Sequence, residues 1–190
     1  MIPDILSEND QKILLELARK SIIAAVHHQP LPKIVLTDYS TKLQANGASF
    51  VTLTKKGSLR GCIGALEPYQ PLVEDVQEHA VAAALHDYRF GPVGSDEIPH
   101  LHIEISYLTI PQPLVYASPD ELPSRLRPNI DGVILKDGYH RATFLPQVWE
   151  KIADPHQFLS QLCQKMGAPS DIWKKQMLQV LTYQVQEFHE

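Results

Sequence analysis

Three patterns in this 190-residue sequence predict an α+β fold with an antiparallel or mixed sheet and flanking helices. Segments with helical spacing of apolar residues are interspersed with segments whose apolar residues alternate. Two of the strand segments run through a turn signal into a second strand, which is typical of hairpins and therefore of antiparallel pairing. This order of elements favours α+β over a doubly wound parallel sheet.

The first half of the chain begins with a predicted amphipathic helix over 8–27. Ser7 is its expected N-cap, with Asp10 completing a weak capping box. Pro30 ends the helix, and a polar, irregular segment follows over 33–46.

A hairpin and a second helix come next. The stretches ASFVTLT (48–54) and LRGCIGAL (59–66) are predicted strands joined by a KKGS turn. Pro71 suits the first position of a helix over 71–87. The Ala-rich second half of that helix would permit a close approach to a sheet.

The second half contains the clearest strand, LHIEISYL (101–108), whose alternate apolar residues share one face. A short helix or turn is expected over 120–126. The segment 132–145 is a predicted hairpin around Asp137-Gly138, a type I′ turn signal.

The C-terminal part is predicted to hold two helical pieces and a strand. The helical pieces cover 146–153 and 155–166, and Gly167 is the expected cap of the second. The alternation in VLTYQV (180–185) predicts one strand.

Composition limits the function classes. Hydrophobic residues make up 44% and charged residues 21%, and the formal net charge of −5 argues against a broad nucleic-acid surface. The two cysteines, Cys62 and Cys163, indicate neither a disulfide scaffold nor a paired zinc motif, so reduced thiols in a cytoplasmic protein are expected. We see no secretory signal and no apolar stretch long enough for a membrane span.

The stretch GSLRGCIGALEP (57–68) carries the main candidate chemistry. Residues two apart on a strand share a face, so Arg60, Cys62 and Gly64 are expected side by side, and Gly61 lies on the other face with the apolar residues. A guanidinium near a thiol favours the nucleophilic thiolate, and strand glycines often mark close approach of a ligand. The alternative is that Cys62 is a small buried core residue.

Three further residues near these elements are candidates. Arg89 would bind an anionic group, with Asp87 orienting it or acting as a base; the alternative is a helix-end ion pair between them. Glu104 is expected on a polar strand face near the site. His100, His102 and Glu104 alternate in sequence, but such a row is usually a solvated face, so no metal is predicted.

Four segments together resemble the AMMECR-type domain family, which includes protein A of the AmmeMemoRadiSam system. They are LRGCIG (59–64), AAALHDYRFGP (82–92), IEISYL (103–108) and RATFLPQV (141–148). The resemblance covers nearly the whole chain, and LRGCIG is its most specific part. Where the family often has His-Gly before the later hairpin, this chain has Asp131-Gly132.

The resemblance implies a single domain over 1–190, made of two unequal α+β lobes with a cleft between them. It adds Phe90 to Gly61, Gly64, Asp87, Arg89 and Glu104 as binding candidates, with Cys62 and Arg60 as the catalytic candidates. It implies a Memo-like protein and a radical-SAM protein as partners and a link to a modification pathway. No cofactor is predicted. The resemblance identifies no reaction.

Three hypotheses for function remain open at the level of sequence. In the first, the chain is an enzyme or enzyme component in which Cys62 is the nucleophile or covalent handle. In the second, Arg60 and Arg89 anchor a small ligand or peptide without chemistry. In the third, the chain is a scaffold for a partner protein and Cys62 is packing.

Overall fold

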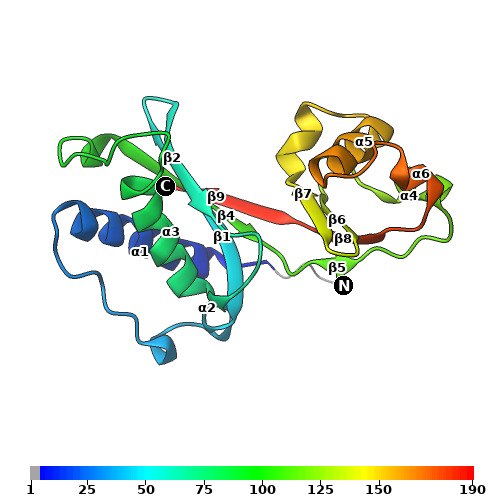
Figure 1. Ribbon diagram of the computed structural model, residues 1–190. Helices are drawn as coiled ribbons and strands as arrows, with labels where there is room; N and C mark the ends of the chain where they lie inside the picture. The colour runs from blue at the N-terminus through cyan, green and yellow to red at the C-terminus, as the bar shows by residue number, and fades with distance from the viewer. Residues whose placement is uncertain (1–4) are drawn as a thin grey trace. The chain divides into compact units, whose positions relative to one another are not determined.

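The computed structural model describes residues 5–190, which form two units (Figure 1). Unit 1 comprises the described residues up to Thr109 together with Gln186–Glu190, and unit 2 is Ile110–Val185. Each unit has its own sheet, helices and hydrophobic core. The predicted α+β class with antiparallel sheets is confirmed.

Unit 1 is built on a sheet with the strand order β2-β1-β4-β9, and β3 pairs with β1. The pairings of β1 with β2, β3 and β4 are antiparallel. The strands are β1 (Asn46–Lys55), β2 (Ser58–Gly64), β3 (Gln70–Pro71), β4 (Leu101–Leu108) and β9 (Val185–His189).

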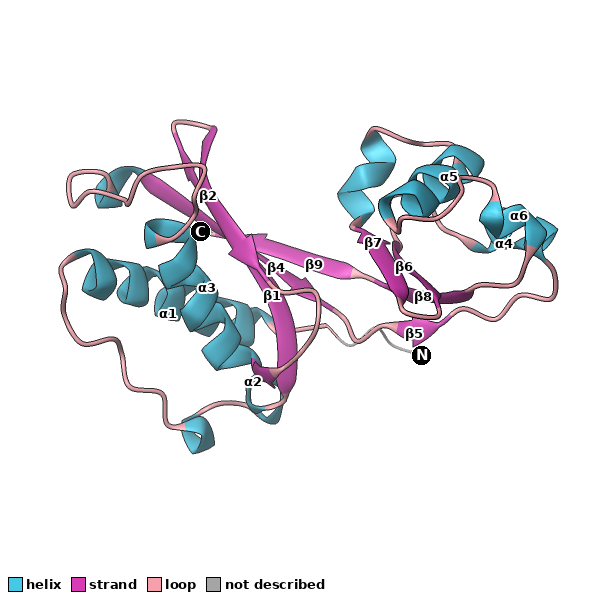
Figure 2. Ribbon diagram, in the orientation of Figure 1, coloured by secondary structure: helices cyan, strands magenta, loops and turns pink. Residues whose placement is uncertain are grey.

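Two long helices, α1 (Glu8–Val26) and α3 (Leu72–Leu85), pack on one face of this sheet (Figure 2). Apolar side chains of β1 and β4, including Val51, Leu53 and Ile103, point into that core. The short elements of unit 1 are η1 (Leu36–Asp38), α2 (Thr41–Gln44) and η2 (Ile98–His100).

The other sheet face of unit 1 is polar around Thr52, while Phe50 and Leu59 also lie on it. Register pairs share a face, and β1 pairs Thr52 with both Cys62 and Glu104, and Thr54 with His102. We call the face formed by Thr52, Thr54, Cys62, His102 and Glu104 the polar face. All five side chains are half-buried or exposed.

Unit 2 contains an antiparallel sheet with the strand order β5-β8-β6-β7. Its strands are β5 (Gln112–Pro113), β6 (Gly132–Asp137), β7 (His140–Phe144) and β8 (Gln179–Tyr183). Its helices are η3 (Pro119–Glu121), α4 (Leu122–Arg125), η4 (Pro146–Glu150), α5 (Pro155–Lys165) and α6 (Ile172–Lys175). The core centres on Trp149 and Phe158, whose rings stack at 3.6 Å between centroids.

Most predicted elements are confirmed, and the N-cap prediction is confirmed in detail: the Ser7 hydroxyl accepts from the Asp10 amide at 3.1 Å. Gly167, at φ 81°, follows α5 as expected. Pro71 is the N-cap of α3 rather than its first residue.

Two predictions were wrong. The stretch 180–185 is not one strand, because β8 ends at Tyr183 in unit 2 and β9 begins at Val185 and joins the sheet of unit 1. The later hairpin turns at Gly138-Tyr139 rather than Asp137-Gly138, since Asp137 pairs with His140. Only the first of these two turn residues, Gly138, has a positive φ, 56°, which matches type II′ rather than type I′.

None of the helices within residues 5–190 combines the length and apolarity needed to cross a membrane.

Replacement of Phe158 by Ala should destabilise unit 2 by about 3–5 kcal/mol, because it removes a fully buried ring stacked on Trp149. Both tryptophans of the chain, Trp149 and Trp173, lie in unit 2, so tryptophan fluorescence during urea unfolding reports this unit. The control is Tyr139→Ala, at a fully exposed hairpin tip, which should leave the midpoint unchanged. An unchanged midpoint for Phe158→Ala would contradict this account of the core.

Candidate functional site

Arg60 does not pair with Cys62 but with Glu97. The β1–β2 register shifts between Leu53 and Thr54, so Arg60 is the extra residue of a bulge. Its guanidinium donates to both Glu97 carboxylate oxygens, at 3.0 and 2.8 Å, and to the Gly91 carbonyl at 2.9 Å. The expectation that Arg60 stands beside the thiol is therefore replaced by a role in holding the 91–97 loop.

The Arg60–Glu97 pair is largely shielded from water, since the two side chains are 16% and 15% exposed. Hydrogen bonds from Arg60, and then from Lys55 at 2.7 Å, hold the pKa of the Glu97 carboxyl well below its usual range. The charge of Arg60 is thus balanced within the loop.

The main chain of Cys62 is held by two side chains. Its N–H donates to Asp87 Oδ2 at 2.9 Å, and its carbonyl accepts from Arg89 Nη2 at 3.1 Å. Because Thr52 and Cys62 form a non-hydrogen-bonded pair of the antiparallel ladder, the N–H and C=O of Cys62 point away from β1, to the outer edge of β2. Asp87 and Arg89 therefore take the place that a further strand would occupy.

Asp87 and Arg89 also form an ion pair with each other, which was the alternative to a ligand-binding role for these two residues. Arg89 donates through Nε to Asp87 Oδ1 at 2.9 Å and through Nη2 to Oδ2 at 2.7 Å. The Asp87 side chain is 2% exposed and that of Arg89 is 42% exposed. The hydrogen bonds from Arg89 hold the pKa of Asp87 well below its usual range although burial opposes this, and Asp87 in turn raises the pKa of Arg89.

The Cys62 thiol lies on the polar face with a hydroxyl beside it. Thr52 Oγ1 donates to Cys62 Sγ at 3.3 Å, and Cys62 as a residue is half-buried. Glu104 is the register partner of Thr52 on the far side, so thiol, hydroxyl and carboxylate form a row across three strands. Such a row supplies a nucleophile, a hydrogen-bond donor and an acid-base group.

The two glycines of the motif have packing roles. A Cβ on Gly61 would overlap the carbonyl oxygen of Ala83, so Gly61 allows the end of α3 to approach β2. A Cβ on Gly64 would overlap Ser49 O and the Phe50 ring, which covers that position. Phe90 lies beside the ion pair, with its ring centroid 5.5 Å from Arg89 Cζ.

Of the predicted residues, the structure brings Cys62, Asp87, Arg89 and Phe90 together at the edge of β2, and Glu104 lies two strands away on the same face. Sequence reasoning missed Thr52. Counting back from the KKGS turn pairs Thr52 with Gly61, and only the bulge at Arg60 brings Thr52 opposite Cys62.

The remaining candidates lie elsewhere. Cys163 is fully buried in the core of unit 2, as predicted, and burial raises the pKa of its thiol. His100 lies in η2 rather than on the strand. Across residues 5–190, no three His, Cys, Asp or Glu side chains gather in a group suited to a metal.

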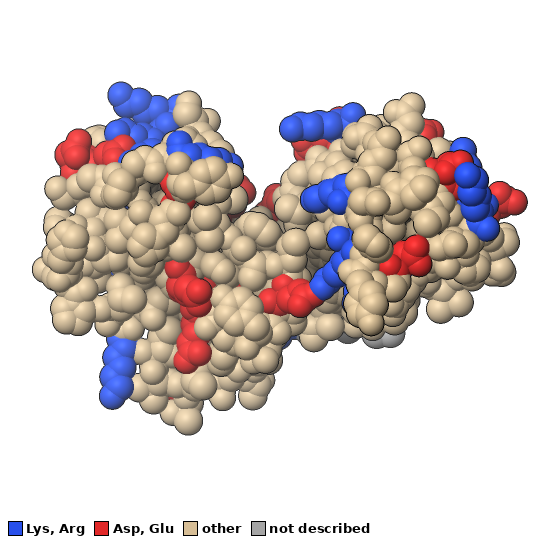
Figure 3. All heavy atoms as spheres, viewed as in Figure 1, with Lys and Arg blue, Asp and Glu red and all other residues tan. Residues whose placement is uncertain are grey.

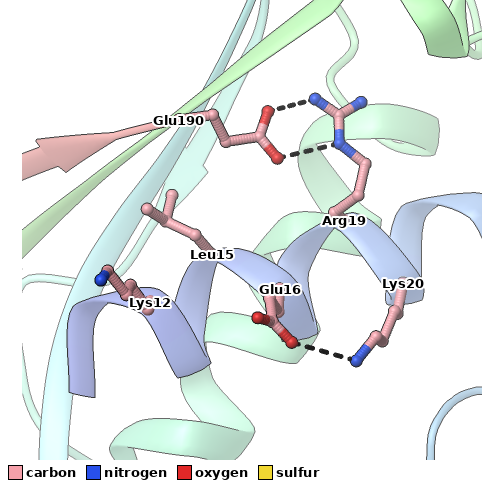
Figure 4. Close-up of a pocket in the computed structure, with 6 residues that line it drawn as sticks. All are labelled: Lys12, Leu15, Glu16, Arg19, Lys20 and Glu190. Atoms are coloured by element: carbon pink, nitrogen blue, oxygen red, sulfur yellow. Dashed lines mark hydrogen bonds and ion pairs between the residues drawn. The ribbon is translucent and has the colours of Figure 1, made fainter. Parts of the chain in front are cut away.

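Two hollows of unit 1 are lined by other residues. One, of about 320 Å³, lies at α1 and the end of β9, where Arg19 pairs with Glu190 and Lys20 with Glu16 (Figure 4). The other lies along α3 and does not include Cys62 either. The candidate site is therefore an area of sheet face rather than one of these hollows.

The Arg60–Glu97 pair predicts an acid-sensitive contribution to the stability of unit 1. Because the pKa of Glu97 is depressed on folding, its contribution is complete above the unfolded value of about 4.3 and is lost as pH falls toward the folded value. Glu97→Gln should cost about 2 kcal/mol at pH 7 and progressively less below about pH 4, measured by thermal unfolding with far-UV circular dichroism. Glu16→Gln, which removes an exposed pair, is the control; a pH-independent cost for Glu97→Gln would refute the assignment.

Comparisons with known proteins agree on one family. The family model AMMECR1 matches residues 15–188. A protein from Methanothermobacter thermautotrophicus is 38% identical over 189 residues, covering 97% of this chain and 96% of that protein. A Methanocaldococcus jannaschii protein is 35% identical over 161 residues, covering 83% and 80%. The crystal structure of an uncharacterised Pyrococcus horikoshii protein has a TM-score of 0.80 and 31% identity, covering 97% of this chain and 93% of that one. This chain therefore belongs to the AMMECR1 family.

Proposed function

We propose that unit 1 carries a thiol-dependent site in which a small ligand binds on the polar face and Cys62 is the reacting group. The protein would then be an enzyme or an enzyme component. One observation carries the proposal: the Cys62 main chain is clamped by the Asp87–Arg89 pair, while the residue is only partly buried and its thiol lies beside a hydroxyl donor.

A packing role for Cys62 does not require this clamp. Taking a carboxylate out of water is costly, and the cost is recovered only with good geometry and further hydrogen bonds. Asp87 has both: its carboxylate accepts from the Arg89 guanidinium and from the Cys62 N–H, and Arg89 in turn donates to the Cys62 carbonyl. A fixed backbone fixes the Cβ of Cys62, and the hydrogen bond from Thr52 orients Sγ, which together hold the sulfur as a reacting group requires.

The residues near the thiol then have distinct roles. Cys62 is the nucleophile or covalent handle, and Thr52 donates a hydrogen bond that stabilises the thiolate. Arg89 adds a positive charge at the Cys62 carbonyl, and Glu104 is the nearby acid-base candidate. Arg60 acts at a distance in this proposal, by fixing the 91–97 loop through Glu97.

The finer family-based expectations are also part of the proposal. We propose that both units act as the single AMMECR-type domain expected over 1–190, in the cytoplasm, where thiols remain reduced. A Memo-like protein and a radical-SAM protein stay predicted partners in a modification pathway, and co-purification with each of them tests this.

Alkylation of Cys62 by iodoacetamide tests the proposal directly. The thiolate sulfur forms a bond to carbon, iodide leaves, and the thiol proton goes to buffer. We expect Cys62 to react in the folded protein at pH 7 while Cys163, which is fully buried, reacts only on unfolding. Peptide mass mapping separates the two sites.

Two variants make the test specific. Thr52→Val removes the donor to Sγ and should slow alkylation of Cys62 at pH 7 up to about tenfold, the equivalent of one charge-assisted hydrogen bond. Thr54→Val changes the next polar-face position of β1, opposite His102, and should leave the rate unchanged. If Cys62 is protected until the protein unfolds, it is a packing residue and the scaffold hypothesis replaces ours. If both variants are alkylated at the wild-type rate, the Thr52 hydroxyl has no role in the reactivity of Cys62.

A further inference from the structure

A groove of about 690 Å³ lies along α3, beside Leu31 and Ile34 of the segment that follows α1. It lies wholly within unit 1 and does not include the polar face. Its apolar lining comes from Leu31 and Ile34 of that segment and from Val81 and Ala82 of α3. Leu31 is 42% exposed, so apolar surface is available to a partner.

The groove is built in advance of any occupant. Pro30 and Pro32 stiffen the segment that forms one wall. Gln77 of α3 fastens this wall, because its side-chain amide donates to the Pro32 carbonyl at 3.0 Å and to Ser21 Oγ at 3.3 Å. A preformed wall lowers the entropy cost of binding.

The charge along the groove has one sign. Glu74 and Glu78 line it from α3, and the described residues of its lining include no Lys or Arg. Figure 3 shows acidic side chains gathered over α3. Glu78 is held by the Gln70 side-chain amide at 2.6 Å and the Tyr69 hydroxyl at 3.2 Å. Burial and then the negative charge of Glu78 raise the pKa of Tyr69 to about 12. Tyr69 is therefore a neutral hydrogen-bond donor, and the negative charge stays on Glu78.

Like charges four residues apart on a helix repel, and a cation between them would relieve this. Positions 74, 77, 78, 81 and 82 recur every three or four residues, so they form one stripe along the helix. With the final lining residue, His86, the stripe extends about 18 Å at 1.5 Å per residue. That length matches about three turns of a second helix, and small Ala82 permits close approach.

We propose that this groove docks an amphipathic helix of a partner protein, with apolar side chains against Leu31 and Val81 and Lys or Arg side chains against Glu74 and Glu78. Charge complementarity selects the basic partner. The inference does not depend on the proposed chemistry of Cys62.

The probe is a fluorescein-labelled 14-residue helical peptide with Leu at i, i+3, i+4 and i+7 and Lys at the flanking positions, titrated by fluorescence anisotropy. Leu31→Ser should weaken its binding at least fivefold, because it removes an exposed apolar contact. Val115→Ser is the matched control, since Val115 is an exposed apolar residue of unit 2. Glu74→Gln and Glu78→Gln should each weaken binding, and Glu150→Gln, at an exposed acidic residue of unit 2, should not.

A second peptide with Glu in place of every Lys should bind at least tenfold more weakly if the charges select the partner. Absence of binding by the Lys peptide, equal binding of the two peptides, or equal effects of the groove and control variants would each overturn the proposal. The alkylation rate of Cys62, measured on the same variants, should stay unchanged. Failure of the groove is therefore distinguishable from failure of the thiol site.

Discussion

The close approach of α3 to the edge strand β2 is the constraint on which the candidate site depends. It requires Gly61, because any Cβ there would meet the carbonyl oxygen of Ala83. Asp87 follows two residues after α3 ends, so the same approach delivers its carboxylate to the Cys62 amide. The Val93 amide donates to the Ala84 carbonyl at 2.9 Å and returns the following loop to the helix end. The LRGCIG motif is thus a packing motif and a positioning motif at once.

In both units, charged side chains form hydrogen bonds with main-chain groups of a strand at the edge of the sheet. In unit 1, Asp87 and Arg89 bind the main chain of β2 at Cys62. In unit 2, Lys165 donates to the Thr143 carbonyl of β7 at 2.9 Å. Charged side chains at such edges prevent another chain from adding a strand. In unit 1 the arrangement also fixes the residue that carries the thiol.

The two positively charged candidates of unit 1 differ in what their charge can do. Arg60 is mostly buried and its charge is balanced by Glu97. Arg89 is more exposed and lies at the carbonyl of Cys62, although Asp87 shares its charge. Of these two arginines, Arg89 is the one whose hydrogen bond reaches Cys62, through the main-chain carbonyl. Arg60 is only two residues from Cys62 in the LRGCIG motif, but the bulge at Arg60 lets its side chain pair with Glu97 rather than stand beside the thiol.

The sequence by itself determined the elements whose signals are local. The helix after Ser7, the strand 101–108 and the hairpin around the KKGS turn are each predicted by caps, alternation or turn residues within a few positions. It also identified Cys62, Asp87 and Arg89 as candidates. Only the tertiary structure decided that Arg60 pairs with Glu97, 37 residues away, and that the C-terminal stretch divides between two sheets. Pairings over such separations depend on how α3 and the loop after it pack, and no local pattern encodes that geometry.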